Sequence, residues 1–318
     1  MRIAVVGKGG SGKTTTSALL ASYLGSVGKK PLLIDADINV HLPALFMREE
    51  FPIEKYLSFP ENMRKVKEYL IGNNHRIASL ATFRKTTPPT KESQLFVLSD
   101  AQSYLYQNFA QDLGTLFLMA VGTYTEDQIG ASCYHNSLAI LENLLSHMDD
   151  RGEVCIVDMV AGVDAFASSL HAQFDMLLLV LEPTRKGIEV RKQYAHLTQS
   201  AGVYDQLFVL GNKCFDQADL DFLRREIPEE KLIGELGMSQ YLRSLERNGD
   251  QISFAGLESE YQPLFFHIFE KLQSLAQPLD TRLPKLYELH RKYVSQDFII
   301  ERFGDLKGQI DESFSFHG

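Results

Sequence analysis

The stretch GKGGSGKTTT at residues 7–16 constrains the fold more than any other part of the chain. It follows RIAVVG at residues 2–7, a short run with the β-branched, apolar composition of a buried strand. It satisfies the pattern G-x-x-x-x-G-K-[ST], in which backbone N–H groups of a glycine-rich loop and of the following helix N-terminus hold phosphates. The stretch therefore predicts a strand, a phosphate-binding loop and a helix in direct succession, and with them a nucleotide site.

The same pattern predicts roles for individual residues of the loop. The side chain of Lys13 is expected to reach the β- and γ-phosphates, and the hydroxyl of Thr14 to bind Mg²⁺. The ligands that the pattern implies are a nucleotide and Mg²⁺. Further nucleotide contacts are predicted along the loop and the start of the helix, at Gly9, Gly10, Ser11, Gly12 and Thr15.

The rest of the chain alternates short apolar runs with helical patterns. Most of the runs lack polar residues at alternate positions, which is typical of strands buried on both faces of a parallel sheet. This alternation predicts an α/β fold, with a doubly wound and mostly parallel sheet and helices on both faces. The runs lie at 2–7, 31–37, 95–100, 115–122, 153–159, 176–183 and 206–212, and the helical patterns at 15–24, 137–148 and 187–201.

Two parts of the chain depart from that alternation. Residues 48–94 are less regular, and RKTTPPTKES at 84–93 is a polar, proline-containing stretch that predicts a mobile loop. After about residue 253 the pattern becomes helical and includes the stretch 284–303. We therefore divide the chain into a P-loop ATPase domain at 1–276, with an irregular insertion at about 48–94, and a C-terminal helical extension and tail at 277–318.

Composition limits the cellular location and the classes of partner that we expect for this protein. The net charge of −9 argues against a surface that binds nucleic acid or anionic lipid as a whole, although a local basic patch stays open. Three cysteines far apart in sequence do not form a disulfide framework. The chain begins with a predicted strand rather than a signal peptide and contains no apolar run long enough to span a bilayer. A cytoplasmic protein is expected, and DNA or membrane partners are not favoured.

The loop contains a second lysine, Lys8, at its mouth. The segment KGGSGKT that begins there resembles the deviant Walker A motif of the MinD/ParA/ArsA/nitrogenase iron protein superfamily of P-loop ATPases. In that superfamily the early lysine reaches across a homodimer to the nucleotide of the partner subunit, much as an arginine finger does. The resemblance implies that Lys8 acts in trans as a catalytic residue beside Lys13, and that ATP closes a homodimer.

Companion segments extend the resemblance. DADIN, which begins at Asp35, is similar to the switch I segment of the superfamily, and this implies that Asp37 orients or activates the attacking water while Asp35 supports the Mg²⁺ shell. CIVDMVAG resembles Walker B running into switch II, which implies that Asp158 holds Mg²⁺ through water and that Gly162 lets switch II respond to the γ-phosphate. LGNKC places Asn212 at a strand end, where the superfamily uses an asparagine on adenine.

Residues 117–148 are similar to a segment of the CooC-type carbon monoxide dehydrogenase accessory ATPases, which mature metallocentres. In that branch a C-x-C pair from each subunit binds a metal ion at the dimer interface. Here Ala131 stands at the first cysteine and Cys133 at the second, so four thiolates cannot assemble. Cys133 and His135 from two subunits could make a two-Cys, two-His site, but a structural cysteine without metal is the simpler interpretation.

The sequence thus favours an Mg²⁺-dependent ATPase that works as a slow dimeric switch, most similar to the CooC-type branch, with an unknown client protein. Two alternatives stay open. One is a MinD/ParA-like positioning ATPase that acts on DNA or membrane, which the net charge and the 117–148 segment disfavour. The other is an ATP-dependent small-molecule ligase or amidotransferase of the same fold, which Lys8 disfavours because those enzymes typically lack it.

Overall fold

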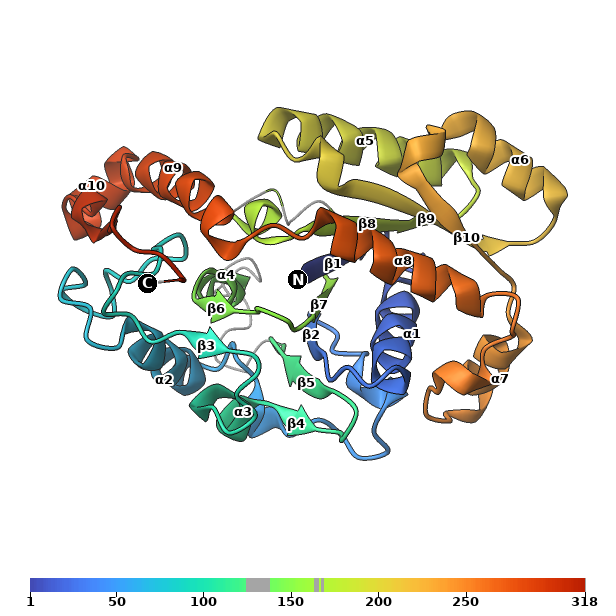
Figure 1. Ribbon diagram of the computed structural model, residues 1–318, viewed down its shortest axis with the longest axis horizontal. Coiled ribbons are helices and arrows are strands. Elements are labelled where there is room, and N and C mark those ends of the chain that lie inside the picture. Colours follow the sequence, from blue (N-terminus) through green and yellow to red (C-terminus); the bar gives the residue numbers. More distant parts are fainter. Residues whose placement is uncertain (124–137, 163–165, 167–168, 318) are drawn as a thin grey trace.

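A computed structural model of the chain describes residues 1–123, 138–162, 166 and 169–317 (Figure 1). Its centre is an eight-stranded sheet in the order β10-β9-β8-β1-β7-β2-β5-β4, in which only the short edge pair β4–β5 is antiparallel. The strands of this sheet are β1 (Arg2–Gly7), β2 (Leu32–Ala36), β4 (Gln111–Asp112), β5 (Phe117–Ala120), β7 (Cys155–Met159), β8 (Met176–Leu181), β9 (Leu207–Cys214) and β10 (Leu232–Gly237).

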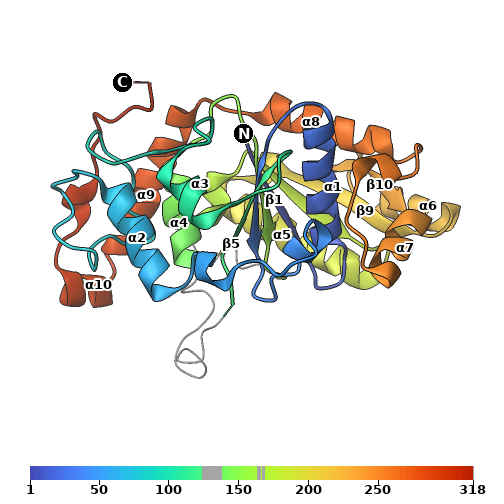
Figure 2. The ribbon, with the colours of Figure 1, turned by 90° about the horizontal axis from the view of Figure 1, so that it is seen from below.

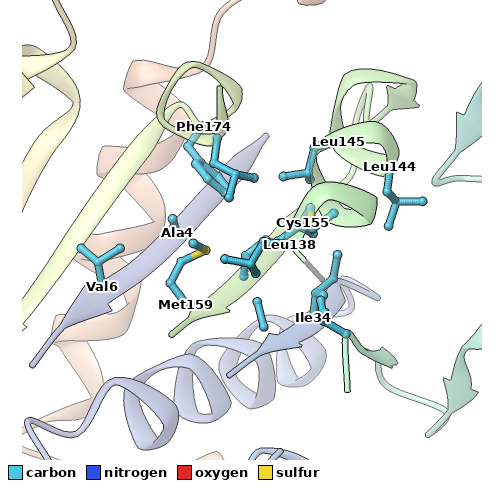
Figure 3. Close-up of a cluster of buried hydrophobic side chains, with 14 of the residues drawn as sticks. Ala4, Val6, Ile34, Leu138, Leu144, Leu145, Cys155, Met159 and Phe174 are labelled. Carbon is cyan, nitrogen blue, oxygen red and sulfur yellow. The ribbon is translucent and has the colours of Figure 1, made fainter. Parts of the chain in front are cut away.

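Helices cover both faces of the sheet, as predicted. Side chains along β1 alternate between two separate cores, with Ile3 and Val5 in one and Ala4 and Val6 in the other. Figure 3 shows Ala4 and Val6 in the second core with Leu138 of α4. The first core is closed by α1 (Lys13–Ser26), α7 (Gln240–Asn248) and α8 (Gln262–Leu275), and the second by α2 (Pro60–Ile71), α3 (Tyr104–Phe109), α4 (Leu138–Ser146), α5 (Arg185–Ala201) and α6 (Gln217–Glu226).

Three local expectations need correction. The strand expected at 95–100 shrinks to β3 (Phe96–Val97), which pairs with β6 (Met148–Asp149) outside the main sheet, because the chain turns at Asp100, whose side chain accepts the N–H of Gln102. The edge strand β10 was not predicted, since two glycines and a glutamate interrupt its apolar pattern. The helical stretch 284–303 divides into α9 (Leu283–Val294) and α10 (Asp297–Phe303).

The insertion and the C-terminal extension lie side by side at one end of the molecule, at the left in Figures 1 and 2. The polar stretch 84–93, within the insertion, packs against the extension rather than forming a mobile loop, with all five residues 86–90 buried. Thr87 Oγ1 donates to Gln309 Oε1 at 2.9 Å, and Gln309 Nε2 donates to the carbonyl of Thr82 at 2.8 Å. The threonines that made this stretch look like a loop therefore serve as hydrogen-bonding partners for the extension.

Buried charges tie the extension to the amino ends of the strands. Arg2, at the start of β1, is 1% exposed and donates to Asp150 Oδ1 from Nε (3.1 Å) and Nη2 (2.8 Å). Arg282, which precedes α9, donates to Asp175 Oδ1 at 2.6 Å and lies 3.5 Å from Asp150. Burial alone would raise the pKa of Asp150, but the two guanidinium groups hold it well below its usual range.

Candidate nucleotide site

The phosphate-binding loop connects β1 to α1 at the carboxyl end of the sheet. Two of its glycines are required by close packing: a Cβ on Gly7 would lie 2.4 Å from the carbonyl oxygen of Val180, and one on Gly12 would lie 2.1 Å from Asn212 Nδ2. Both glycines also have positive φ, 147° and 96°. Since Lys13 begins α1, the backbone N–H groups of the first helical turn face the loop, as anion binding needs.

The two lysines of the loop occupy different environments. Lys13 is buried, and its Nζ donates to the carbonyl of Lys8 across the loop at 3.3 Å. The Lys8 side chain is exposed at the mouth of the loop. Lys13 is therefore preset toward the interior of the loop, while the ammonium of Lys8 faces outward, where a second molecule could meet it.

Asp158 is the penultimate residue of β7 and lies beside the start of α1. Its Oδ2 accepts a hydrogen bond from Thr14 Oγ1 at 2.7 Å, and its Oδ1 accepts one from Ser17 Oγ at 3.1 Å. Burial raises the pKa of Asp158 to about 6, although these hydrogen bonds and the charge of Lys13 lower it. A buried carboxylate and a hydroxyl in contact give the oxygen donors that Mg²⁺ prefers.

Asp35 lies on the neighbouring strand in register with Asp158. Its two oxygens accept backbone N–H groups from the following loop, Oδ1 from Asp37 and Oδ2 from Leu42, both at 2.9 Å. Burial, and then the charge of Asp158, raise the pKa of Asp35 to about 8. Asp35 therefore positions the predicted switch I segment through these two hydrogen bonds, and its raised pKa favours the protonated form beside Asp158 at neutral pH.

The predicted switch I segment is held in a tight turn. The Oδ1 of Asp37 accepts the backbone N–H and the side-chain amide of Asn39, each at 3.0 Å. The next residue, Val40, has φ of 47°, a left-handed conformation that a β-branched side chain rarely adopts. Asp37 is half-buried, so its carboxylate is held in place beside the loop and stays accessible.

The end of β9 secures the loop from the opposite side. Asn212 Nδ2 donates to the carbonyl of Ser11 at 2.7 Å, and Lys213 Nζ donates to the carbonyl of Gly10 at 2.6 Å. The same ammonium pairs with Glu182 Oε1 at 2.8 Å. Asn212, for which the resemblance implies a contact with adenine, holds the loop in this structure, and Lys213 and Glu182 were not among the predicted site residues.

Gly162, the predicted switch II glycine, lies next to the loop. Its N–H donates to the carbonyl of Gly7 at 3.3 Å, and its own carbonyl accepts the hydroxyl of Tyr194 from α5. Ser17 and Tyr194 are further residues that sequence reasoning missed. Ser17 lies one turn after Thr14 on the same helix, and this spacing is the signal that could have identified it.

Two cavities flank the loop. One of 160 Å³ is lined by Lys8, Ser11 and Glu182, among others, and the buried hydroxyl of Ser11 has no hydrogen-bond partner within the described part of the chain. The other, of 100 Å³, is lined by Thr15, Asn212 and the loop after β10. Unused hydrogen-bonding groups at these walls are suited to a polar ligand.

The candidate interface-metal residues cannot be placed. Cys133 and His135 lie in 124–137, outside the described residues. Within the ranges that the structure describes, no group of three or more His, Cys, Asp or Glu side chains could hold a metal ion. Cys155 and Cys214 are buried, and burial raises the pKa of each thiol to about 12, so both are packing residues.

Comparison with known proteins agrees with this geometry. A model of the CobQ/CobB/MinD/ParA nucleotide binding domain matches residues 3–257. An uncharacterised ATP-binding protein of Methanocaldococcus jannaschii is 29% identical over 244 residues, or 76% of this chain and 85% of that protein. The carbon monoxide dehydrogenase accessory protein CooC of Rhodospirillum rubrum is 25% identical over 256 residues, or 78% of this chain and 88% of CooC.

Among solved structures, the ATP complex of an aspartate-to-alanine variant of Cyanothece McdA superposes with a TM-score of 0.57 at 16% identity, covering 87% of this chain and 96% of that one. At this identity the likeness establishes the fold. Across the residues that can be described, no helix of this chain is both long and apolar enough to cross a membrane.

Proposed function

The chain belongs to the CobQ/CobB/MinD/ParA nucleotide-binding family, and we propose that it is an ATP-binding and ATP-hydrolysing switch that closes as a homodimer. The observation that carries the proposal is the Asp158–Thr14 contact beside Lys13: a buried carboxylate whose pKa is raised, next to a hydroxyl and a phosphate-binding lysine. A charge buried in this way is costly unless a cation or ligand completes the site.

The residues present suit Mg²⁺. Thr14 and Asp158 would hold the ion, and Asp35 on the neighbouring strand would support its shell once the bound cation favours the ionised carboxylate. Bound there, Mg²⁺ would neutralise charge on the β- and γ-phosphates during phosphoryl transfer. Asn212 and the cavity beside it would receive the nucleobase, and the N–H groups of the loop would receive the phosphates.

For hydrolysis we assign two groups of the chain. Asp37, held by Asn39 at the rim of the site, orients the attacking water and accepts its proton. Lys8 of a second subunit places its ammonium on the phosphates when two molecules meet face to face, and its exposed position in the single chain supports this role. Because the site is then complete only in the dimer, turnover depends on association.

The biological role that we favour is that of a CooC-like accessory ATPase acting on a client protein. The similarity to Rhodospirillum rubrum CooC over most of both chains supports it, together with the resemblance of residues 117–148. A MinD/ParA-like positioning activity and a ligase activity stay alternatives. Co-sedimentation with DNA or anionic vesicles in the presence of ATP would favour the positioning role if it were saturable.

The trans role of Lys8 can be tested by mixing two inactive variants. Lys8→Ala subunits are expected to bind ATP through Lys13 and the loop, but not to hydrolyse it or dimerise with it. Asp37→Ala subunits are expected to bind ATP and stay dimeric without turnover. In a mixed dimer the Asp37→Ala subunit supplies its Lys8 to the partner's site, whose own Asp37 is intact.

Mixing the two should therefore restore about half of the wild-type rate per mixed dimer, because one of its two sites is complete. Light scattering would confirm that mixed dimers form, and calorimetry that both variants bind ATP. A lysine acting within its own subunit predicts no recovery, and that result in a confirmed mixed dimer would overturn the proposal.

A further inference from the structure

A cavity of 190 Å³ is lined by residues from three parts of the chain, the insertion, α9, and the described residues Phe166 and Ser169. This volume corresponds to about six water molecules at roughly 30 Å³ each. We infer that the cavity binds a small organic anion, a carboxylate or phosphate monoester with a flat apolar body, and that its occupancy is transmitted to the nucleotide loop. Its walls include Lys85, Thr86, Phe166, Ser169, Lys292 and Tyr293.

The charge around the cavity favours an anion. Lys85 and Lys292 line it, and Arg84 approaches from the same side, donating to the hydroxyl of Tyr293 at 3.2 Å. The acidic neighbour is Glu142, whose Oε1 lies 3.7 Å from Lys85 Nζ. Among the described side chains, the two lysines of the wall and the nearby Arg84 outnumber the carboxylate of Glu142, which leaves a local positive excess there.

Glu142 is also occupied by other groups. Its Oε2 accepts both the N–H and the hydroxyl of Ser169, at 3.0 Å and 2.5 Å. The Lys85 side chain is about one quarter exposed and its Nζ lies 5.6 Å from the ring centroid of Tyr293, so it stays within reach of a ligand at the aromatic wall. Lys292 is exposed at the mouth of the cavity.

The remaining walls define the kind of anion. Thr86 and Ser169 are buried polar residues, while Phe166 and Tyr293 present aromatic surface. Walls that combine polar groups with aromatic rings suit a compact molecule with one charged group and a flat body. A nucleotide would be too large for this volume.

The cavity is connected to the nucleotide loop through packed rings. Phe166 meets Tyr194 edge-on, with ring centroids 5.7 Å apart, and the Tyr194 hydroxyl donates to the carbonyl of Gly162. Gly162 in turn donates to Gly7 of the loop at 3.3 Å. A ligand that shifts Phe166 therefore acts through Tyr194 on Gly162, the glycine that the resemblance to the superfamily assigns to the response to the γ-phosphate.

This site is not a shared feature of the family domain, because α9 lies beyond the residues 3–257 that the family model matches. Any ligand there is recognised by the extension together with the insertion. The insertion and the extension together thus form a site that residues 3–257 alone lack.

Binding is tested first, without nucleotide, by ¹⁹F NMR of 4-fluorobenzoate on the full chain, with neutral 4-fluorobenzyl alcohol as the matched probe. Wild-type protein should broaden the benzoate signal saturably and leave the alcohol unaffected. Lys292→Glu should weaken binding by at least about tenfold through charge reversal. Lys285→Met, which removes a lysine of the same helix that pairs with Glu288, should change binding by less than about twofold.

Absence of saturation up to about 10 mM, or equal binding by Lys292→Glu, would overturn the assignment. The coupling, which rests on the proposed ATPase activity, is measured separately as a change in ATP turnover on adding the probe. Tyr194→Phe should keep probe binding and lose that change, because the hydroxyl contact to Gly162 is gone. Binding without any effect on turnover in an active enzyme would reject the coupling alone.

Discussion

Buried carboxyl groups at the two ends of the central sheet have pKa values shifted in opposite directions. At the amino end, Asp150 lies between Arg2 and Arg282, and its pKa is held low. At the carboxyl end, Asp158 and Asp35 lie side by side against hydroxyl and amide donors, and their pKa values rise to about 6 and about 8. One end is an internally compensated ion cluster that stabilises the fold, and the other holds carboxyl groups whose ionisation is unfavourable until a cation or ligand binds beside them.

The largest change in the free energy of unfolding is expected at the amino end of the sheet, where Asp150 pairs with Arg2 and Arg282. Asp150→Asn leaves Arg2 buried with an unmatched charge, and should lower the free energy of unfolding by about 3–5 kcal/mol. Chemical denaturation at pH 7.5 without nucleotide measures it. The control is Glu288→Gln, which breaks the exposed pair with Lys285 and should cost less than about 0.5 kcal/mol. A loss below about 1 kcal/mol for Asp150→Asn would mean that this end is not a structural cluster.

The second prediction is a gain in stability, opposite in sign to the first. Asp158→Asn removes a buried charge while keeping a group that can hydrogen-bond Thr14 and Ser17, so at pH 8 the nucleotide-free protein should gain about 2 kcal/mol of stability. Magnesium-dependent ATP binding should fall sharply in the same variant. Calorimetry and denaturation together check both halves. If Asp158→Asn destabilises the protein as Asp150→Asn does, the contrast between the two ends is wrong.

The third prediction concerns pH and a group remote from both ends. His290 is buried between Thr86 Oγ1 and the carbonyl of Leu306, and burial lowers its pKa to about 4. Since the unfolded chain binds this proton with a pKa near 6.5, the stabilising contribution of neutral His290 is present above about pH 6.5 and is lost as pH falls toward 4.

Between pH 7 and pH 5 the wild-type protein should therefore lose about 1–2 kcal/mol more stability than a His290→Gln variant does. The difference between the two proteins cancels the titration of Asp158 and of the other buried histidine, His147. Parallel pH profiles for wild type and variant would show that His290 does not control the acid response of the extension.

The smallest effect, a modest loss of ATP affinity, is expected from the hydrogen bond that Lys213 at the end of β9 donates to the loop. Lys213→Ala removes one charge-assisted hydrogen bond to the loop carbonyl of Gly10, worth about 1 kcal/mol, and should weaken ATP binding by roughly fivefold. Lys213→Gly is the matched variant, because it removes the same ammonium and also relieves the positive φ of 59° at this residue. Equal losses of ATP affinity in the two variants would assign the effect to the Lys213 ammonium. Full affinity in either variant would show that its hydrogen bond to Gly10 does not support ATP binding.

The sequence predicted those features that depend on short segments of the chain. The loop from Gly7 to Thr14 and the strands beside it are as expected, because each motif is continuous and fixed by local backbone chemistry. Asp158 reaches Thr14 because parallel strands deliver their carboxyl ends to one edge. The fold of the family domain follows from the same regularity.

Features that join distant segments were not predictable. Nothing in the sequence of the 84–93 stretch shows that Thr87 pairs with Gln309, more than 200 residues later. Lys213 and Glu182 look like ordinary charged residues until β8 and β9 are placed side by side. Such contacts depend on the packing of the tertiary structure, so only the coordinates reveal them.

The left-handed backbone at Val40 affects how readily the predicted switch I segment changes conformation. A β-branched residue held at positive φ costs about 1–3 kcal/mol, which the hydrogen bonds around Asp35 and Asp37 have to offset. Any rearrangement that returns Val40 to an extended conformation recovers that energy. A free-energy difference of about 1.4 kcal/mol changes a population tenfold. The energy recovered at Val40 therefore lowers, by the same amount, the difference in affinity that a nucleotide needs in order to select the rearranged state. Replacing Val40 with glycine would remove this bias and leave the resting conformation more populated.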